Sequence, residues 1–141
     1  MRTIGSESAI ELARNAASVD ASTPARAWYT HRLDRSDLDY YLVEFGEVDA
    51  VVAVAAINAS TGELLTWARL PGRGRHLMTK AEAVERTGWS EFARADLVWR
   101  ECRATRSLLY PLWEIRRPSE TLYVDQTGVV SASLAPAGPG G

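Results

Sequence analysis

Cysteine, histidine and long apolar runs are scarce in this sequence of 141 residues, and each shortage excludes a class of protein. Cys102 is the single cysteine, so the chain cannot form an intramolecular disulfide, and a zinc site that needs two thiolates is excluded. His31 and His76 are the two histidines, and their spacing does not place two ligands on one helix face. We therefore expect no metal site and no cofactor, and a reducing compartment, the cytoplasm.

The longest apolar run, residues 50–57, is too short to cross a bilayer, which requires about 20 residues. Glu7 and Glu11 interrupt the beginning of the chain before an apolar segment develops, so we expect no secretory signal. The formal net charge is −2, with −4 over residues 1–70 and +2 over residues 71–141. We do not expect nucleic acid as a partner of such a chain, because duplex binding requires a strong cluster of cations.

The apolar pattern predicts a helix followed by four strands, and then the same order again. Apolar spacing indicates the first helix, and Ser6 or Ser8 is a candidate cap for it. Thr79 and Glu82 have the spacing of a capping box, and Gly88 is expected to end the second helix. The expected helices are 7–17 and 79–86, and the expected strands are 26–33, 40–45, 50–57, 64–70, 97–106, 109–115, 121–125 and 129–134.

The two halves of the chain repeat a strand and a turn at nearly constant separation. Residues 41–45 align with residues 111–115, which places Glu44 on Glu114, 70 residues apart. We therefore expect an α+β fold of tandem helix plus antiparallel β-sheet repeats, with the helices packed on one face of the sheet. The first repeat is expected over 1–70 and the second over 77–134, with a Gly-rich linker at 71–76 and a disordered tail at 135–141.

The strand at Trp113, Glu114 and Ile115, followed by the sequence YVDQTG at 123–128, resembles the PepSY domain. The first copy departs from that pattern because Asn58 stands where the family usually has aspartate. The resemblance implies a cystatin-like helix-on-sheet fold and a binding or inhibitory role, since PepSY units occur in protease propeptides, sensory proteins and small standalone proteins. The architecture is also similar to that of beta-lactamase inhibitor proteins, which carry disulfides that this chain cannot form.

Aromatic residues are plentiful, with five tryptophans and five tyrosines. A sheet that helices cover on one side cannot bury all of them, so we expect some to line the uncovered face, where tryptophan, tyrosine and arginine are typical of protein-binding hot spots. Helices or a second copy in a homodimer could equally cover that face. The candidate partner-binding residues are Trp28, Tyr41, Trp67, Trp99, Trp113 and Tyr123.

The sequence offers little for catalysis, and we expect no enzyme and no catalytic residue. Cys102 could act as a nucleophile with a histidine, but a buried structural cysteine is the commoner role. Glu44 and Glu114 invite a hypothesis of paired carboxylates for acid–base chemistry. Strand glutamates on a solvated sheet face, paired with Arg116 or Arg32, are the simpler interpretation.

The leading hypothesis is a non-catalytic protein-binding module, an inhibitor, immunity or accessory factor, acting through an aromatic sheet face. One alternative is a small-ligand sensor with a pocket between sheet and helices. Another is a weak RNA or anionic-ligand binder that uses Arg73 and Arg75, whose guanidinium groups can engage phosphate or carboxylate bidentately. For the segment with these arginines, a solvated linker is the simpler interpretation.

Overall fold

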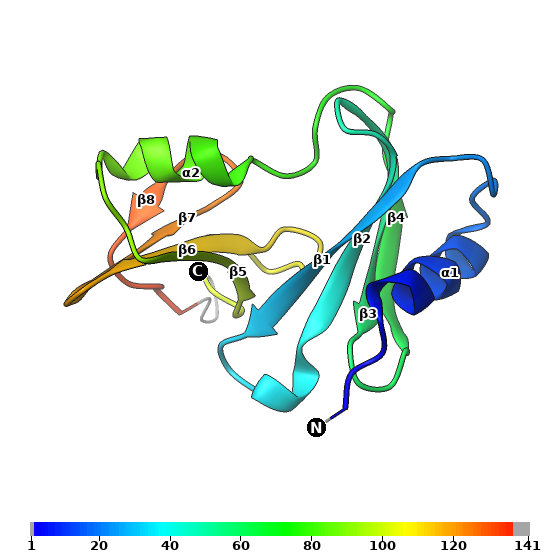
Figure 1. Ribbon diagram of the computed structural model, residues 1–141, viewed down its shortest axis with the longest axis horizontal. Helices are drawn as coiled ribbons and strands as arrows, with labels where there is room; N and C mark the ends of the chain where they lie inside the picture. The colour runs from blue at the N-terminus through cyan, green and yellow to red at the C-terminus, as the bar shows by residue number, and fades with distance from the viewer. Residues whose placement is uncertain (1, 137–141) are drawn as a thin grey trace. The chain divides into compact units, whose positions relative to one another are not determined.

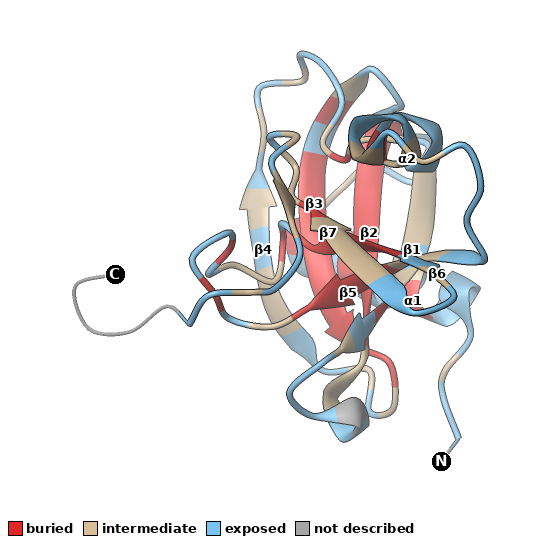
Figure 2. Ribbon diagram, turned by 90° about the vertical axis from the view of Figure 1, so that its left-hand side faces the viewer, coloured by how far each residue is buried: buried red, intermediate tan, exposed pale blue. Residues whose placement is uncertain are grey.

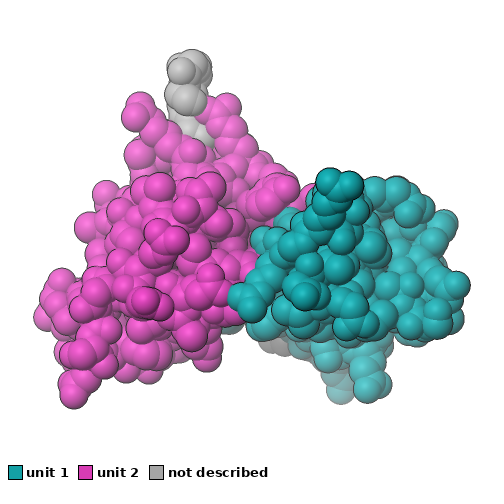
Figure 3. Space-filling model, turned by 90° about the horizontal axis from the view of Figure 1, so that it is seen from above, with its two compact units in different colours: residues 1–76 teal, residues 77–141 magenta. Residues whose placement is uncertain are grey.

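The computed structural model describes residues 2–136 (Figure 1). The chain divides into two compact units, residues 1–76 and residues 77–141, which Figure 3 colours separately. The disorder expected at the C-terminus falls mainly on residues 137–141, which lie outside the described residues. Ala135, just before them, accepts a backbone hydrogen bond of 2.9 Å from Arg103 through its carbonyl oxygen.

Unit 1 consists of a helix followed by an antiparallel meander of four strands. The strands lie in the order β4-β3-β2-β1, so each strand pairs with its neighbour in the sequence. The elements are α1 (Ser6–Ala17), β1 (Ala25–Arg32), the short 3-10 helix η1 (Ser36–Leu38), β2 (Tyr40–Glu47), β3 (Ala50–Asn58) and β4 (Leu64–Arg69).

Unit 2 repeats this order, with one helix and then four antiparallel strands in the order β5-β6-β7-β8. The predicted fold class, an α+β fold with helix plus antiparallel sheet repeats, is therefore confirmed. The elements are α2 (Lys80–Thr87), β5 (Arg94–Trp99), β6 (Leu112–Arg117), β7 (Glu120–Val124) and β8 (Val130–Ser131).

The helix α1 packs through alanines spaced four residues apart, Ala9, Ala13 and Ala17, which are all buried. This spacing places them on one stripe of the helix, and their small side chains allow the helix to approach the sheet closely. The predicted serine caps are wrong: Gly5 is the N-cap, and no side chain caps the helix. Ser18 ends the helix in the left-handed conformation, with φ 53°.

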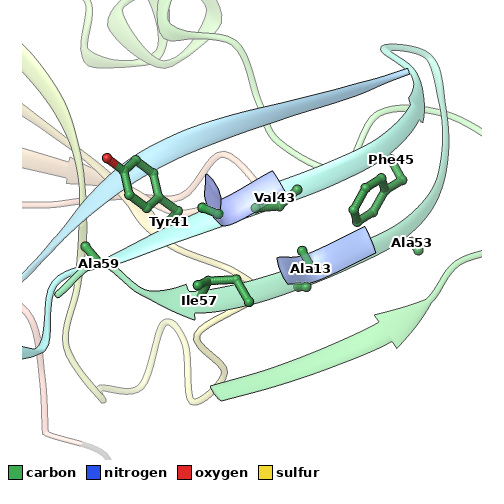
Figure 4. Packing of buried hydrophobic residues seen from close by; sticks show 9 residues of the cluster. Ala13, Tyr41, Val43, Phe45, Ala53, Ile57 and Ala59 are labelled. Carbon is green, nitrogen blue, oxygen red and sulfur yellow. The ribbon is translucent and has the colours of Figure 1, made fainter. Parts of the chain in front are cut away.

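The core of unit 1 lies between this alanine stripe and one face of β2 and β3 (Figure 4). Alternate residues of a strand point to the same face, so β2 and β3 each supply every second side chain. Figure 2 shows both strands as largely buried. The strands contribute Tyr41, Val43, Phe45, Ala53, Ala55 and Ile57, and the turn after β3 adds Ala59.

The helix α2 begins and ends as its sequence predicts. The Thr79 hydroxyl accepts a hydrogen bond of 3.1 Å from the Glu82 backbone N–H and donates one of 3.0 Å to the Glu82 carboxylate. Gly88 ends the helix with φ 73°, a left-handed conformation that glycine adopts at little cost. Both the predicted cap and the predicted end of this helix are confirmed.

The strand boundaries differ from prediction in unit 2. The strand β5 ends at Trp99, whereas the prediction ran from 97 to 106, because the chain turns back at a bridge between Cys102 and Thr105. The strand β6 begins at Leu112 rather than 109, since Pro111 has no N–H to donate to a ladder. Of the helices in residues 2–136, none is long and apolar enough to span a membrane.

Substitution of the buried residue Phe45 tests the packing of the unit 1 core. This side chain is fully inaccessible, and the Arg14 guanidinium lies 5.3 Å from the ring centroid. We expect Phe45→Ala to lower the free energy of unfolding by about 3–5 kcal/mol, because it removes buried apolar surface and leaves a cavity. Chemical denaturation measures this change. The control is Leu33→Ala at an exposed position, which should lower the free energy of unfolding by less than about 0.5 kcal/mol. Equal losses of stability in the two variants would contradict the burial of Phe45 in the core.

The environment of Tyr29 predicts that the folded chain loses stability at alkaline pH. Its hydroxyl donates a hydrogen bond of 2.9 Å to Asp39, and burial together with this bond raises the pKa of Tyr29 to about 12. The unfolded chain releases that proton near pH 10, so the folded chain holds it more tightly. The stabilisation is therefore complete below about pH 10 and is lost as the pH rises towards about 12.

Comparison with Tyr29→Phe isolates this effect from the other tyrosines. The stability advantage of the wild-type chain over the variant, measured by denaturation at several pH values, should shrink between about pH 10 and about pH 12. An advantage that does not change with pH would show that Tyr29 titrates as it does in the unfolded chain.

Candidate protein-binding surface

The strand β4 ends the sheet of unit 1, with β3 on its inner side. A tight turn leads into it, in which the Asn58 side-chain oxygen accepts hydrogen bonds of 2.8 and 2.9 Å from the N–H groups of Ser60 and Thr61. Gly62 follows with φ 77°. Asparagine and glycine suit such a turn because one satisfies backbone donors and the other adopts positive φ without strain.

Trp67 lies on the side of the sheet that carries α1, because it pairs with the core residue Ala55. Its side chain is exposed, at 38%. The Arg69 guanidinium lies 5.7 Å from the Trp67 ring centroid and donates a hydrogen bond of 3.3 Å to the Ala17 carbonyl oxygen at the end of α1. Arg69 therefore links the indole to the end of the helix, which restrains the ring without covering it.

Two further large apolar side chains are exposed on these elements, Leu64 on β4 and Leu12 on α1. Leu12 lies against the turn before β4, since a Cβ atom added to Gly62 would come within 2.9 Å of its Cδ1. We call these residues the β4 surface, with Arg69 as its charged end. Its apolar members are Leu12, Leu64, Leu65 and Trp67.

The three predicted aromatic residues of unit 1 do not share one open face. Tyr41 is buried in the core beneath α1, and its hydroxyl donates a hydrogen bond of 2.9 Å to the Ile4 carbonyl oxygen. Trp28 is exposed, but it pairs with Leu42 and faces away from α1, whereas Trp67 is on the helix side. These tryptophans are therefore on opposite faces of the sheet of unit 1.

The three predicted aromatic residues of unit 2 are largely enclosed. Trp99 and Trp113 are buried, and their indole N–H groups donate hydrogen bonds of 2.8 Å to the carbonyl oxygens of Ser107 and Met78. Tyr123 is partly buried against the cluster that contains Cys102. Substitution of Trp99 or Trp113 would consequently test folding rather than an accessible surface.

Glu44 is buried, whereas we expected a glutamate on a solvated face. One carboxylate oxygen accepts two hydrogen bonds, of 2.6 Å from the Trp28 indole N–H and of 3.0 Å from the Arg26 Nε. The Arg26 Nη1 also donates a hydrogen bond of 2.9 Å to the Gly46 carbonyl oxygen. The partner is therefore Arg26, opposite Glu44 on the neighbouring strand, and not Arg32, which pairs with Asp34.

Glu114 occupies the corresponding place in unit 2 and is buried as well. It accepts a hydrogen bond of 2.7 Å from the Arg116 Nε, as the sequence predicts, but the carboxylate is enclosed rather than solvated. Its Oε2 atom is buried without a hydrogen-bond partner. Burial, followed by the neighbouring Glu114 carboxylate, raises the pKa of the Tyr123 phenol.

The two glutamates explain why the repeat is visible in the sequence. Each lies on the sheet face opposite the helix of its own unit, and a buried carboxylate requires charged or polar donors. The donors differ, an indole and a guanidinium in unit 1 and a guanidinium in unit 2. A glutamate repeated within two apolar strands was the sequence signal for such a buried network.

Arg73 and Arg75, the proposed anion-binding residues, lie exposed on the loop after β4. This loop is held in place, because the Gly74 N–H donates a hydrogen bond of 2.7 Å to the Asp49 carbonyl oxygen. The Gly74 carbonyl oxygen in turn accepts one of 3.3 Å from Val51. The loop thus brings two exposed arginines to the end of the β2–β3 hairpin.

A small open pocket of about 310 Å³ lies in unit 2, between the loop after α2 and the β6–β7 hairpin. It does not occupy the space between sheet and helix in which we expected a ligand. One wall is Arg117, whose guanidinium lies 4.0 Å from the Trp89 ring centroid and is paired with Glu120. Its lining residues are Ser90, Glu91, Phe92, Ala93, Arg117 and Pro118.

The candidate catalytic side chains occupy ordinary structural positions. Cys102 is fully buried beside Val98 and Leu112. The His31 Nδ1 lies 3.3 Å from the Asp39 carboxylate. Within residues 2–136, no group of three or more histidine, cysteine, aspartate or glutamate side chains could hold a metal ion.

Comparison with known proteins adds little to this geometry. No family model matches the sequence, and no curated protein matches it. The crystal structure of a "putative lipoprotein" from Clostridium difficile 630 is 16% identical, with a TM-score of 0.38 over 93% of each chain. The relation to PepSY domains therefore stays a resemblance of short sequence motifs.

The Glu44 network predicts a measurable loss of stability. We expect Glu44→Ala to lower the free energy of unfolding by about 2–3 kcal/mol, because it leaves the partly buried Arg26 guanidinium and the Trp28 N–H without their acceptor. Denaturant titration measures this loss. Glu47→Ala, at the exposed end of the same strand, is the control and should change stability by less than about 0.5 kcal/mol. Similar small effects for both would show that the network contributes no net stability.

Proposed function

We propose that this chain is a non-catalytic protein-binding module of the cytoplasm, an inhibitor, immunity or accessory factor of PepSY-like type, and that it binds through the β4 surface. The observation that carries the proposal is Trp67, a tryptophan held by Arg69 yet exposed, on the last strand of a sheet. Tryptophan and arginine are the residues that most often dominate the energy of protein interfaces.

The end strand supplies a second means of recognition. The outer side of a terminal strand presents backbone N–H and C=O groups, to which an extended segment of another protein can add as a further strand. Main-chain hydrogen bonds would then provide affinity, and the side chains of the β4 surface would select the segment. Such a partner carries an apolar side chain for contact with Trp67 and an acidic group that complements Arg69.

Site-specific photo-crosslinking tests this proposal in cells that produce the protein. A benzophenone amino acid at position 67 is expected to yield a discrete product whose crosslink maps to an extended segment of the partner. The same group at position 48, where Val48 is 55% exposed on the β2–β3 turn, is the control and should not yield that product. No product from position 67, or the same product from both positions, would overturn the proposal.

Unlabelled variants that compete with the crosslinking chain for the partner then measure the contribution of the Trp67 indole to binding. We expect Trp67→Ala to compete at least tenfold more weakly than the wild-type chain, because truncation of a hot-spot tryptophan usually costs more than 1.4 kcal/mol. Trp28→Ala, on the opposite face of the sheet, should compete as the wild type does. Circular dichroism of both variants verifies that each is folded.

A further inference from the structure

The pocket of unit 2 combines charges of both signs with apolar surface. Its volume of about 310 Å³, between the loop after α2 and the turn from β6 to β7, is in the range of small-molecule sites. Arg117 and Glu91 supply the charges, and Phe92, which is 41% exposed, and Pro118 supply apolar surface. A ligand that matches all of these walls carries an anionic, a cationic and an apolar group.

The guanidinium of Arg117 is already oriented by its neighbours. It lies 4.0 Å from the Trp89 ring centroid, and its Nε and Nη2 donate hydrogen bonds of 3.1 and 2.7 Å to one carboxylate oxygen of Glu120. Among the described residues, none accepts a hydrogen bond from its Nη1. A guanidinium held in this way loses little conformational entropy on binding a carboxylate, so Arg117 suits an anionic group.

Glu91 provides the opposite charge on the facing wall of the pocket. It is exposed, and its carboxylate forms no ion pair or hydrogen bond with another side chain of the described residues. The Ser90 hydroxyl beside it can donate or accept a hydrogen bond. The carboxylate of Glu91 therefore has its full capacity to accept hydrogen bonds from an ammonium group.

We propose that this pocket binds a free amino acid with an aromatic side chain. Its α-carboxylate accepts hydrogen bonds from Arg117, its α-ammonium donates to Glu91, and its ring packs against Phe92 and Pro118. A zwitterion matches a pocket that has one cationic and one anionic wall, and aromatic rings attract one another beyond their buried area. This inference concerns unit 2 and does not depend on the β4 surface.

The size of the pocket agrees with such a ligand. A cavity of about 150 Å³ lined by apolar side chains holds one benzene molecule. The pocket of unit 2 has about twice this volume. It therefore accommodates a benzyl side chain together with the two charged groups.

Titration of the isotope-labelled chain with L-phenylalanine, followed by NMR, tests the proposal. The backbone amide signals of residues 90–93 and 117 are expected to shift and saturate with a Kd of about 1 mM, as suits a small ligand in an open pocket. Phenylalaninamide lacks the carboxylate, N-acetylphenylalanine lacks the ammonium group, and L-alanine lacks the ring. Each should bind at least about fivefold more weakly, because each loses one of the three contacts.

Two substitutions assign the charged contacts to particular residues. Glu91→Gln should weaken the binding of phenylalanine at least about fivefold and leave that of N-acetylphenylalanine unchanged, since the latter has no ammonium group. Arg117→Gln should likewise weaken phenylalanine and leave phenylalaninamide unchanged. The control is Glu85→Gln, an exposed position on α2 that does not line the pocket, which should bind phenylalanine as the wild-type chain does.

Thermal unfolding of each variant verifies that it is folded, which matters for Arg117 because it contacts Trp89 and Glu120. Three results would overturn the inference: no saturable shift at residues 90–93 and 117 in about 10 mM phenylalanine, equal binding of the four ligands, or equal binding by Glu91→Gln and Glu85→Gln. None of them bears on the proposed function, which fails instead when position 67 yields no crosslink.

Discussion

The close packing of an alanine-lined helix against one face of β2 and β3 is the contact on which the rest of unit 1 depends. Ala9, Ala13 and Ala17 let α1 approach the sheet, so the apolar side chains of the two central strands all turn towards it. This face determines the orientation of every alternate residue across the sheet. It therefore decides that Tyr41 is a core residue, that Glu44 is on the opposite face, and that Trp67 lies at the margin of the helix.

The two units each bury a glutamate at an equivalent position, but different polar residues donate hydrogen bonds to it. Both bury a glutamate on the strand next to the first strand of the meander, at positions 44 and 114. Burial of a carboxylate is costly unless donors surround it, and the chain supplies them locally from an opposite strand in unit 1 and from the same strand in unit 2. A shared framework with different donors accounts for a repeat that is clear in topology but weak in sequence.

The end strand β4 connects this architecture with the proposed binding role. A helix that covers β2 and β3 leaves the last strand half covered, so Trp67 is oriented by Arg69 and remains accessible. The candidate catalytic groups, in contrast, are dispersed or buried, as Cys102 is. The β4 surface presents an aromatic ring, aliphatic side chains and a strand edge, and the proposed binding role rests on these features.

The amino-acid sequence by itself determined the order of helices and strands, the repeat and the capping of α2, because these depend on local periodicity and on turn residues such as Gly88. Only the tertiary structure decided which aromatic residues are accessible and that Glu44 and Glu114 are enclosed. Periodicity shows that alternate residues share a face, but not which face a helix covers or which strand ends the sheet. Those properties arise from contacts between residues far apart in the chain, as between Arg69 and Ala17.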